Sequence, residues 1–139
     1  MFALRINSRR CISPLKHTTS QLSTRTMSTA PAKHQFIVWA PDYTDPEAFD
    51  RRLAVRAAHL QNAFELIKNG VIKTGGAMMS PDTYLTENKK FVGSAMIVEA
   101  ESIEAVRKQV ESDIYWSSNV WDKEKLTILP FFAPPPPKA

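Results

Sequence analysis

Four runs rich in β-branched and aromatic residues alternate along the chain with two segments of helical periodicity. The runs that predict strands are residues 34–39, 71–79, 91–98 and 126–129. The helical segments extend from about Asp45 to Asn69 and from Ser102 to about Glu111, and residues 112–116 indicate an irregular single turn. The order βαββαβ is typical of the ferredoxin-like arrangement, an α+β fold in which an antiparallel sheet carries two helices on one face.

The first helical segment has the clearest periodicity. Asp45 suits the N-cap, Pro46 suits the first helical position, and Gly70 is placed to end the helix. Apolar residues recur every three or four positions, which predicts a stripe packed against the core. The residues of this stripe are Phe49, Leu53, Ala57, Leu60, Phe64 and Ile67.

Arg56 and His59 lie three residues apart on the border of this stripe, so their side chains are neighbours. Two interpretations are open. The pair can belong to a functional site, or Arg56 can extend its charge to water while His59 is a hydrogen-bonded residue at the edge of the core.

Two of the predicted strands are apolar on both sides. Residues 36–39 and 95–98 do not alternate apolar with polar positions, and strands of this kind are buried on both faces. Two helices cover only one face of the sheet. The pattern therefore predicts a homodimer in which a second copy of the sheet covers the other face.

The second predicted strand contains an adjacent pair of glycines, Gly75 and Gly76. Glycine inside a strand marks a bulge or the close approach of a ligand or another backbone, and a simple bend is an equal alternative.

Charge is unevenly distributed between the N-terminus and the remainder of the chain. Residues 1–33 contain six basic residues and no acidic one, whereas the remainder carries 12 basic and 14 acidic residues. The N-terminal segment is also rich in Ser and Thr, which is typical of a mitochondrial presequence and predicts the matrix as destination. A disordered basic tail is the alternative, and a start at Met27 would give a cytoplasmic form.

These boundaries leave one domain, residues 34–131, between the leader of residues 1–33 and a proline-rich tail of residues 132–139. The slightly acidic domain argues against a nucleic-acid partner, which requires a basic face. No apolar run reaches the roughly 20 residues of a membrane span.

Several kinds of site are excluded by the residues present. Cys11 is the only cysteine and lies in the leader, so the domain offers no thiolate ligand or nucleophile. His34 and His59 lack the spacing of metal ligands, and no glycine-rich phosphate loop or Gly-x-Ser-x-Gly motif is present. We expect neither a metal nor a cofactor.

Three short motifs occur together in an order that resembles the YCII-related domain family, small proteins of the dimeric α/β-barrel superfamily. They are Arg56-Ala57-Ala58-His59-Leu60, Gly75-Gly76 and Ser112-Asp113-Ile114-Tyr115, and the resemblance covers about residues 34–131. It implies that His59 and Asp113 form an active-site dyad beside Arg56. The common Asp-Pro-Tyr of the family is here Asp113-Ile114-Tyr115. Some relatives resemble dehydrochlorinases or isomerases of ring compounds.

The resemblance and the residues together suggest proton transfer on a small anionic or aromatic molecule, as in an isomerase or a dehydrochlorinase-like lyase. His59 would be the base, held in one tautomer by Asp113, and Arg56 would bind an anionic oxygen. The other residues expected around the ligand are Gly75, Gly76 and Tyr115, with Trp39, Met78 and Met96 as apolar wall.

Three alternatives stay open at this point. Asp113 can be a helix cap, or Arg56 can pair with Asp113 and leave His59 without a role. The same pocket can also hold a small ligand without converting it, as in a non-catalytic binding or accessory module.

Overall fold

The structure is a computed structural model that describes residues 31–135. Most of the predicted leader, residues 1–30, and the last residues of the predicted tail, 136–139, lie outside the described residues. The presequence and its mitochondrial destination therefore stay predictions. No helix among residues 31–135 is long and apolar enough to cross a membrane.

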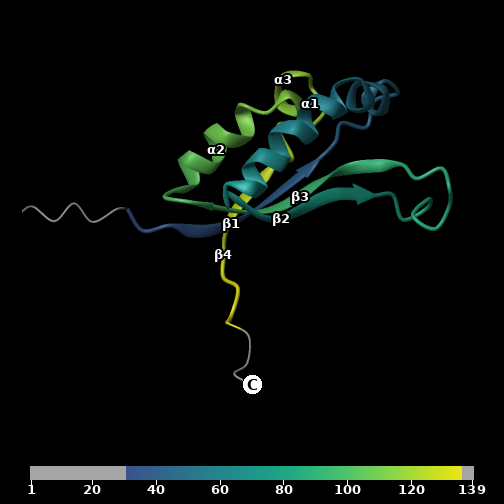
Figure 1. Ribbon diagram of the computed structural model, residues 1–139. Coiled ribbons are helices and arrows are strands. Elements are labelled where there is room, and N and C mark those ends of the chain that lie inside the picture. Colours follow the sequence, from purple (N-terminus) through teal and green to yellow (C-terminus); the bar gives the residue numbers. More distant parts are fainter. Residues whose placement is uncertain (1–30, 136–139) are drawn as a thin grey trace, which may run out of the picture.

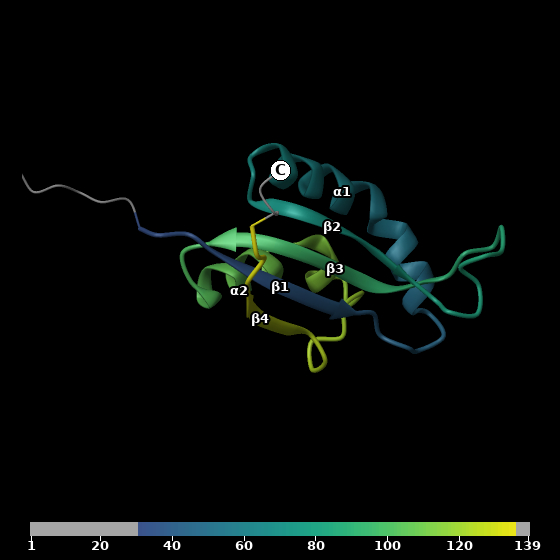
Figure 2. The ribbon, with the colours of Figure 1, turned by 90° about the horizontal axis from the view of Figure 1, so that it is seen from below.

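The described chain forms one four-stranded antiparallel sheet with three helices on one face (Figure 1). The strands are β1 (His34–Pro41), β2 (Ile72–Met79), β3 (Phe91–Ala100) and β4 (Thr127–Phe131), and the helices are α1 (Ala48–Lys68), α2 (Ile103–Glu111) and α3 (Ile114–Ser117). Their spatial order is β2-β3-β1-β4, as Figure 2 shows from the open side of the sheet. The predicted ferredoxin-like α+β fold is confirmed.

The core lies between the sheet and the helices. Phe36, Val38 and Ala40 alternate along β1 and are buried under the helix layer. Val38 is paired with Met96 of β3 on one side and with Ile128 of β4 on the other, so one face of the sheet forms a continuous apolar surface. Val106 and Val110 of α2 pack against this surface.

The opposite face of the sheet is apolar and uncovered in the single chain. Trp39 of β1 is 50% exposed and Leu129 of β4 is 55% exposed. Between them lies Ile37, which pairs with Ile97 and Leu129. The prediction of strands that are apolar on both sides therefore holds, while the homodimer inferred from it stays a prediction.

The orientation predicted for α1 is wrong. Phe49, Leu53, Phe64 and Ile67 of the predicted core stripe are exposed, with Phe64 the most exposed at 62%. Of the predicted stripe, Leu60 is partly buried, and Leu60, Phe64 and Ile67 border the cavity described below although Phe64 and Ile67 stay largely open to solvent. The side with Ala48, Arg52, Val55, His59 and Leu66 is turned further inward. The physical reason is that acidic partners inside the fold, Asp42 and Asp113, bind the two cation-forming side chains of that side.

Two predicted boundaries also require correction. The helix α1 begins at Ala48 with Glu47 at the N-cap, so Asp45 and Pro46 lie in the preceding turn, where Asp45 accepts a hydrogen bond from the backbone N–H of Glu47. Strand β4 continues through Pro130, which was expected to end it. Proline is tolerated there because β4 is an edge strand.

Candidate functional site

His59 and Asp113 are brought together across the helix layer although 54 residues separate them in the sequence. The Nδ1 atom of His59 lies 2.8 Å from Oδ1 of Asp113, and the two side chains are 12% and 8% exposed. With Asp113 ionised, Nδ1 must carry the proton of this bond. Nε2 of His59 has no hydrogen-bond partner among residues 31–135 and is not fully enclosed, so it is left as the basic nitrogen.

Asp113 is held in place by its own local structure. It is the N-cap of α3, and Oδ1 accepts a hydrogen bond of 2.8 Å from the backbone N–H of Tyr115. The side chain of Asn62, three residues after His59 on α1, donates to Oδ2 at 3.4 Å. The capping role and the contact with His59 were set as alternatives, and the geometry contains both.

The imidazole of His59 is fixed by two aromatic rings as well. The ring of Tyr115 stacks on it with centroids 3.8 Å apart and planes at 13°, and Trp121 meets it edge-on at 5.7 Å. Burial raises the pKa of the Tyr115 hydroxyl above its usual value, and the charges of Arg52 and Arg56 act in the opposite direction. Tyr115 is thus neutral at ordinary pH.

A second pair between α1 and a buried carboxylate, Arg52 with Asp42, lies beside the His59–Asp113 pair. The sequence reasoning did not predict it. Arg52 donates from Nη1 to both carboxylate oxygens of Asp42, at 2.7 and 2.9 Å, and from Nη2 to Ser94 Oγ at 3.2 Å. The Nε1–H of Trp121 donates to the same hydroxyl. Burial raises the pKa of the Asp42 carboxyl, against the pull of the Arg52 charge.

The Cζ atom of Arg52 also lies 4.7 Å from the centre of the Tyr115 ring, so the Arg52–Asp42 and His59–Asp113 pairs both contact that ring. Its Nε is buried without a partner among the described residues. A sequence signal for Arg52 did exist: it precedes His59 by seven residues, which is close to two helical turns and places both on one side of α1.

Arg56 has a different environment from Arg52. Its guanidinium lies 5.9 Å from the centre of the Phe91 ring, and no acidic side chain within residues 31–135 pairs with it. The alternative of an ion pair between Arg56 and Asp113 is therefore not the geometry found. Arg56 stays available to an anion.

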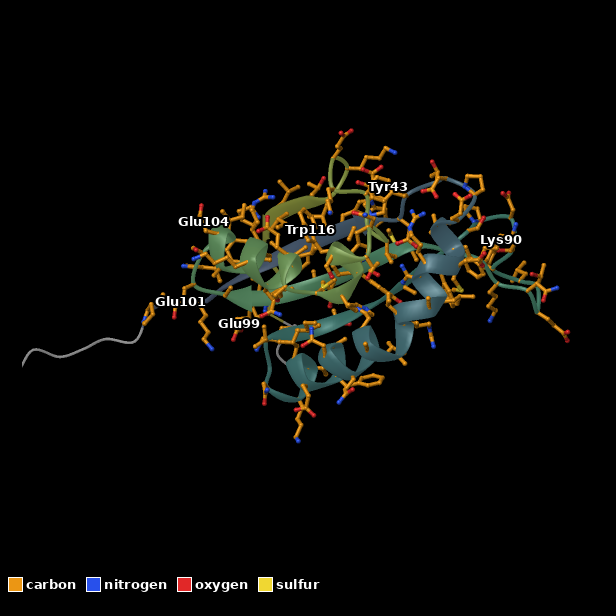
Figure 3. All side chains as sticks on the ribbon, turned by 90° about the horizontal axis from the view of Figure 1, so that it is seen from above. Tyr43, Lys90, Glu99, Glu101, Glu104 and Trp116 are labelled. Atoms are coloured by element: carbon orange, nitrogen blue, oxygen red, sulfur yellow. The ribbon has the colours of Figure 1, made fainter. Side chains whose placement is uncertain are left out.

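These side chains border a cavity of about 190 Å³ between α1 and the sheet. Arg52, Arg56, His59, Asp113 and Tyr115 contribute to its lining, and both predicted glycines border it from β2. Figure 3 shows the helix layer from above, with α1 along one side and α2 and α3 along the other. Of the predicted apolar wall, Met96 lines the cavity, whereas Trp39 and Met78 do not.

Gly75 and Gly76 have different surroundings although both border the cavity. A Cβ atom built on Gly75 would lie 2.9 Å from Cβ of Met96, closer than real Cβ contacts, whereas one on Gly76 would meet no atom within 4 Å. Gly75 therefore lets β2 approach β3 beside the cavity, which is the close backbone approach that the glycine pair suggested.

Comparison with known proteins assigns the family. The sequence pattern of the YCII-related domain matches residues 35–131. The chain belongs to the YCII-related domain family.

The relatives differ in length and in name. Protein YciI of Escherichia coli O6:H1 is 32% identical over 96 residues, which cover 69% of this chain and 94% of YciI. The aspercryptin biosynthesis cluster protein B of Emericella nidulans is 30% identical over 101 residues, or 72% of this chain. The matched part spans only 64% of that fungal protein.

A solved structure shares the fold of this YCII-related chain. It is the 5-chloro-2-hydroxyhydroquinone dehydrochlorinase TftG from Burkholderia phenoliruptrix AC1100, in complex with 2,5-dihydroxybenzoquinone. The TM-score is 0.59, the identity is 24%, and the match covers 70% of this chain and 93% of TftG. At this identity the likeness concerns the fold.

The arrangement in this family member is suited to moving a proton. A neutral imidazole with one nitrogen bound to a carboxylate has a defined tautomer, and the other nitrogen can accept a proton from a molecule in the cavity. The carboxylate then stabilises the imidazolium that forms. Among residues 31–135, no three His, Cys, Asp or Glu side chains are grouped as metal ligands would be.

Proposed function

We propose that the cavity beside His59 is an active site for proton transfer on a small, planar, acidic molecule, with isomerisation or elimination as the reaction. The observation that carries the proposal is the 2.8 Å contact between His59 Nδ1 and Asp113 at the border of a cavity. The name of the structural relative TftG, a dehydrochlorinase in complex with a quinone, supports this class of reaction.

The first step takes a proton from an acidic O–H or C–H group of the ligand to Nε2 of His59. The electron pair left behind forms a new π bond. In an elimination, a leaving group such as chloride departs with its bonding pair, and in an isomerisation His59 returns the proton to another atom of the ligand. No oxidant or reductant is required, because the electrons are only redistributed within the ligand.

Three side chains would assist this step. Asp113 offsets the positive charge that His59 gains, and Tyr115 keeps the imidazole plane fixed by stacking. Arg56 has no acidic partner among the described residues, so its charge is available for the oxyanion that develops on the ligand. Removal of a positioned base of this kind typically costs about 10²–10⁴-fold in rate.

The test uses 2,5-dihydroxybenzoquinone as probe and measures exchange of its ring hydrogens for deuterium in heavy water by mass spectrometry. In this exchange a deuteron adds to a ring carbon of the enolate to give an sp3 centre next to a carbonyl, and the base then removes the original proton from that carbon and restores the π bond. We expect the full-length protein to accelerate the exchange and the His59→Ala variant to lose at least about a hundredfold of that acceleration. Circular dichroism of the variant should match that of the parent, which shows that it is folded, while its thermal midpoint should fall because the Asp113 carboxylate loses the hydrogen bond from His59.

A matched control is Gln61→Ala, which shortens an exposed side chain on the same helix, outside the cavity lining. This control should exchange at the parent rate. Equal exchange by the parent and by a folded His59→Ala protein would contradict the proposal. Binding of the quinone without any exchange would leave a ligand-binding module in place of an enzyme.

We infer further that the working unit is a homodimer joined through the open face of the sheet. Trp39 of the inner strand β1 and Leu129 of the edge strand β4 expose large apolar side chains on this face, and monomers rarely leave such a patch uncovered. Sedimentation at micromolar concentration should show a dimer. Trp39→Glu should give monomers, whereas Leu85→Glu, at a position 82% exposed between β2 and β3, should not.

A further inference from the structure

The cavity next to His59 differs from one end to the other. At one end, Arg52, Arg56 and Ser94 provide polar groups. At the other end the lining is formed by side chains of α1, β2 and β3 that are mostly hydrocarbon, namely Phe64, Leu66, Ile67, Ile72 and Val98.

The register of the sheet gives the direction of this gradient. Ser94 is paired with Ala77, and Val98, four residues further along β3, is paired with Ile72. Four residues of strand correspond to about 13 Å. On α1, Arg52 and Leu66 are 14 residues apart, or about 21 Å. His59 lies midway on α1, so the reactive imidazole faces the middle of an elongated site.

The charges at the polar end leave room for one anion. The charge of Arg52 is matched by Asp42, and His59 is bound to Asp113. Arg56 has no such acidic partner among residues 31–135. The polar end thus carries one unmatched positive charge, whereas Gln109 is the only polar side chain lining the apolar end in the described part of the chain.

We propose that the site binds an amphiphilic monoanion, a carboxylate or phenolate whose apolar tail extends from Arg56 past His59 to the Ile72–Val98 end. This inference rests on the proposed function only in placing the ligand in the same cavity. The size supports it: a protein cavity of about 150 Å³ holds benzene, so 190 Å³ holds about seven or eight carbon atoms by proportion.

The test measures the affinity of the full-length protein for straight-chain carboxylates by calorimetry, below the concentrations at which these acids aggregate. The series is butanoate, hexanoate, octanoate and decanoate. We expect binding to tighten about fourfold per methylene, the ratio that corresponds to about 0.8 kcal/mol. The gain should stop near octanoate, where the cavity is full.

Two further measurements examine the ends of the cavity separately. Octanamide, which has the same tail without the charge, should bind about tenfold more weakly than octanoate. Arg56→Met should reduce the affinity for octanoate to that for octanamide and leave the affinity for octanamide unchanged.

The apolar end is tested by Ala63→Phe, which places a ring in the cavity and should remove the dependence of affinity on chain length. Ala58→Phe, on the exposed side of α1 outside the lining, should retain that dependence.

A flat affinity series, or an unchanged series in a folded Ala63→Phe protein, would overturn the inference and show that the apolar end packs against protein instead. Failure of the proposed function gives a different result. Octanoate has no role for a base, so His59→Ala should still bind it. Binding of the series without His59-dependent deuterium exchange would retain the amphiphile site and reject the catalysis.

Discussion

Two carboxylates inside this small fold each hold a side chain of α1, and the two pairs differ in what they leave free. Asp42 receives two hydrogen bonds from Arg52, whose remaining Nη2 atom binds Ser94, and the pair is almost completely buried. Of the two ring nitrogens of His59, Asp113 binds only Nδ1, so Nε2 is left without a hydrogen-bond partner among the described residues, at the cavity. Arg52 and His59 are two helical turns apart on one side of α1.

The two pairs differ in whether a proton can move within them. A guanidinium cannot be deprotonated in a protein, so the Arg52–Asp42 pair fixes the position of α1 and of the Tyr115 ring without moving a proton. An imidazole gains and loses a proton near neutral pH. Under the proposed function, the same type of anchor has a structural role in one pair and a reactive role in the other, so changes to each pair should have different consequences.

The largest effect on stability is expected from breaking the Arg52–Asp42 pair. Arg52→Met leaves the Asp42 carboxylate buried without a partner, which typically costs about 3–5 kcal/mol in the free energy of unfolding. Urea denaturation measures this cost. Because the penalty belongs to the unpaired charge, Arg52→Met combined with Asp42→Asn should regain most of it, and a double variant as unstable as the single one would contradict the account.

Breaking the His59–Asp113 pair should affect the proposed reaction more than the stability. Asp113→Asn can still cap α3, because its carbonyl oxygen accepts the hydrogen bond from Tyr115 N–H, but it removes the charge that stabilises the imidazolium. We expect deuterium exchange to fall about a hundredfold or more. Asp113→Ala should lose the cap as well, with an additional cost of about 1 kcal/mol. Equal exchange by Asp113→Asn and the parent protein would show that the carboxylate only caps the helix.

The two adjacent glycines of β2 that border the cavity, Gly75 and Gly76, offer a matched pair of substitutions. Gly75→Ala forces a Cβ atom against Met96, and overpacking of this kind costs about 1–3 kcal/mol. Gly76→Ala enters open space and should be neutral or slightly stabilising. Thermal unfolding of the two variants compares them directly. Equal stability would mean that β2 does not approach β3 as closely as described.

The smallest effect concerns Tyr115, the ring that both pairs share. Its pKa is raised above 10.0 in the folded protein by burial, so above about pH 10 the unfolded state loses this proton first. Folded protein then binds more protons than unfolded protein, and stability falls as the pH rises. Tyr115→Phe should make the alkaline part of the stability profile flatter. An unchanged slope would show that the hydroxyl is not buried in this way.

The sequence contained enough information for the order of the elements and for one of the two pairs. Strand composition and turn residues predicted βαββαβ because local propensity and topology agree in this fold. The His59–Asp113 pair followed from the resemblance to a family, since no local pattern links residues 54 positions apart.

The orientation of α1 could not be predicted in the same way. Periodicity reveals that an apolar stripe exists, but it does not reveal what covers the stripe. Here the side with Arg52 and His59 faces inward, because Asp42 and Asp113 form hydrogen bonds with these two side chains, and Phe64 is left exposed. Polar side chains with partners inside the fold therefore reversed a rule that holds for helices whose polar side meets water.

The most direct test of the account is the protonation of the His59 ring, measured by long-range ¹H–¹⁵N correlation NMR on protein labelled in its histidines. His59 is identified by the signals lost in His59→Gln, because the chain has only three histidines. In the neutral form of the ring we predict the proton on Nδ1, facing Asp113, and none on Nε2. A neutral ring with its proton on Nε2, or one that exchanges rapidly between the two tautomers, would contradict the claim that Asp113 prepares His59 as a base.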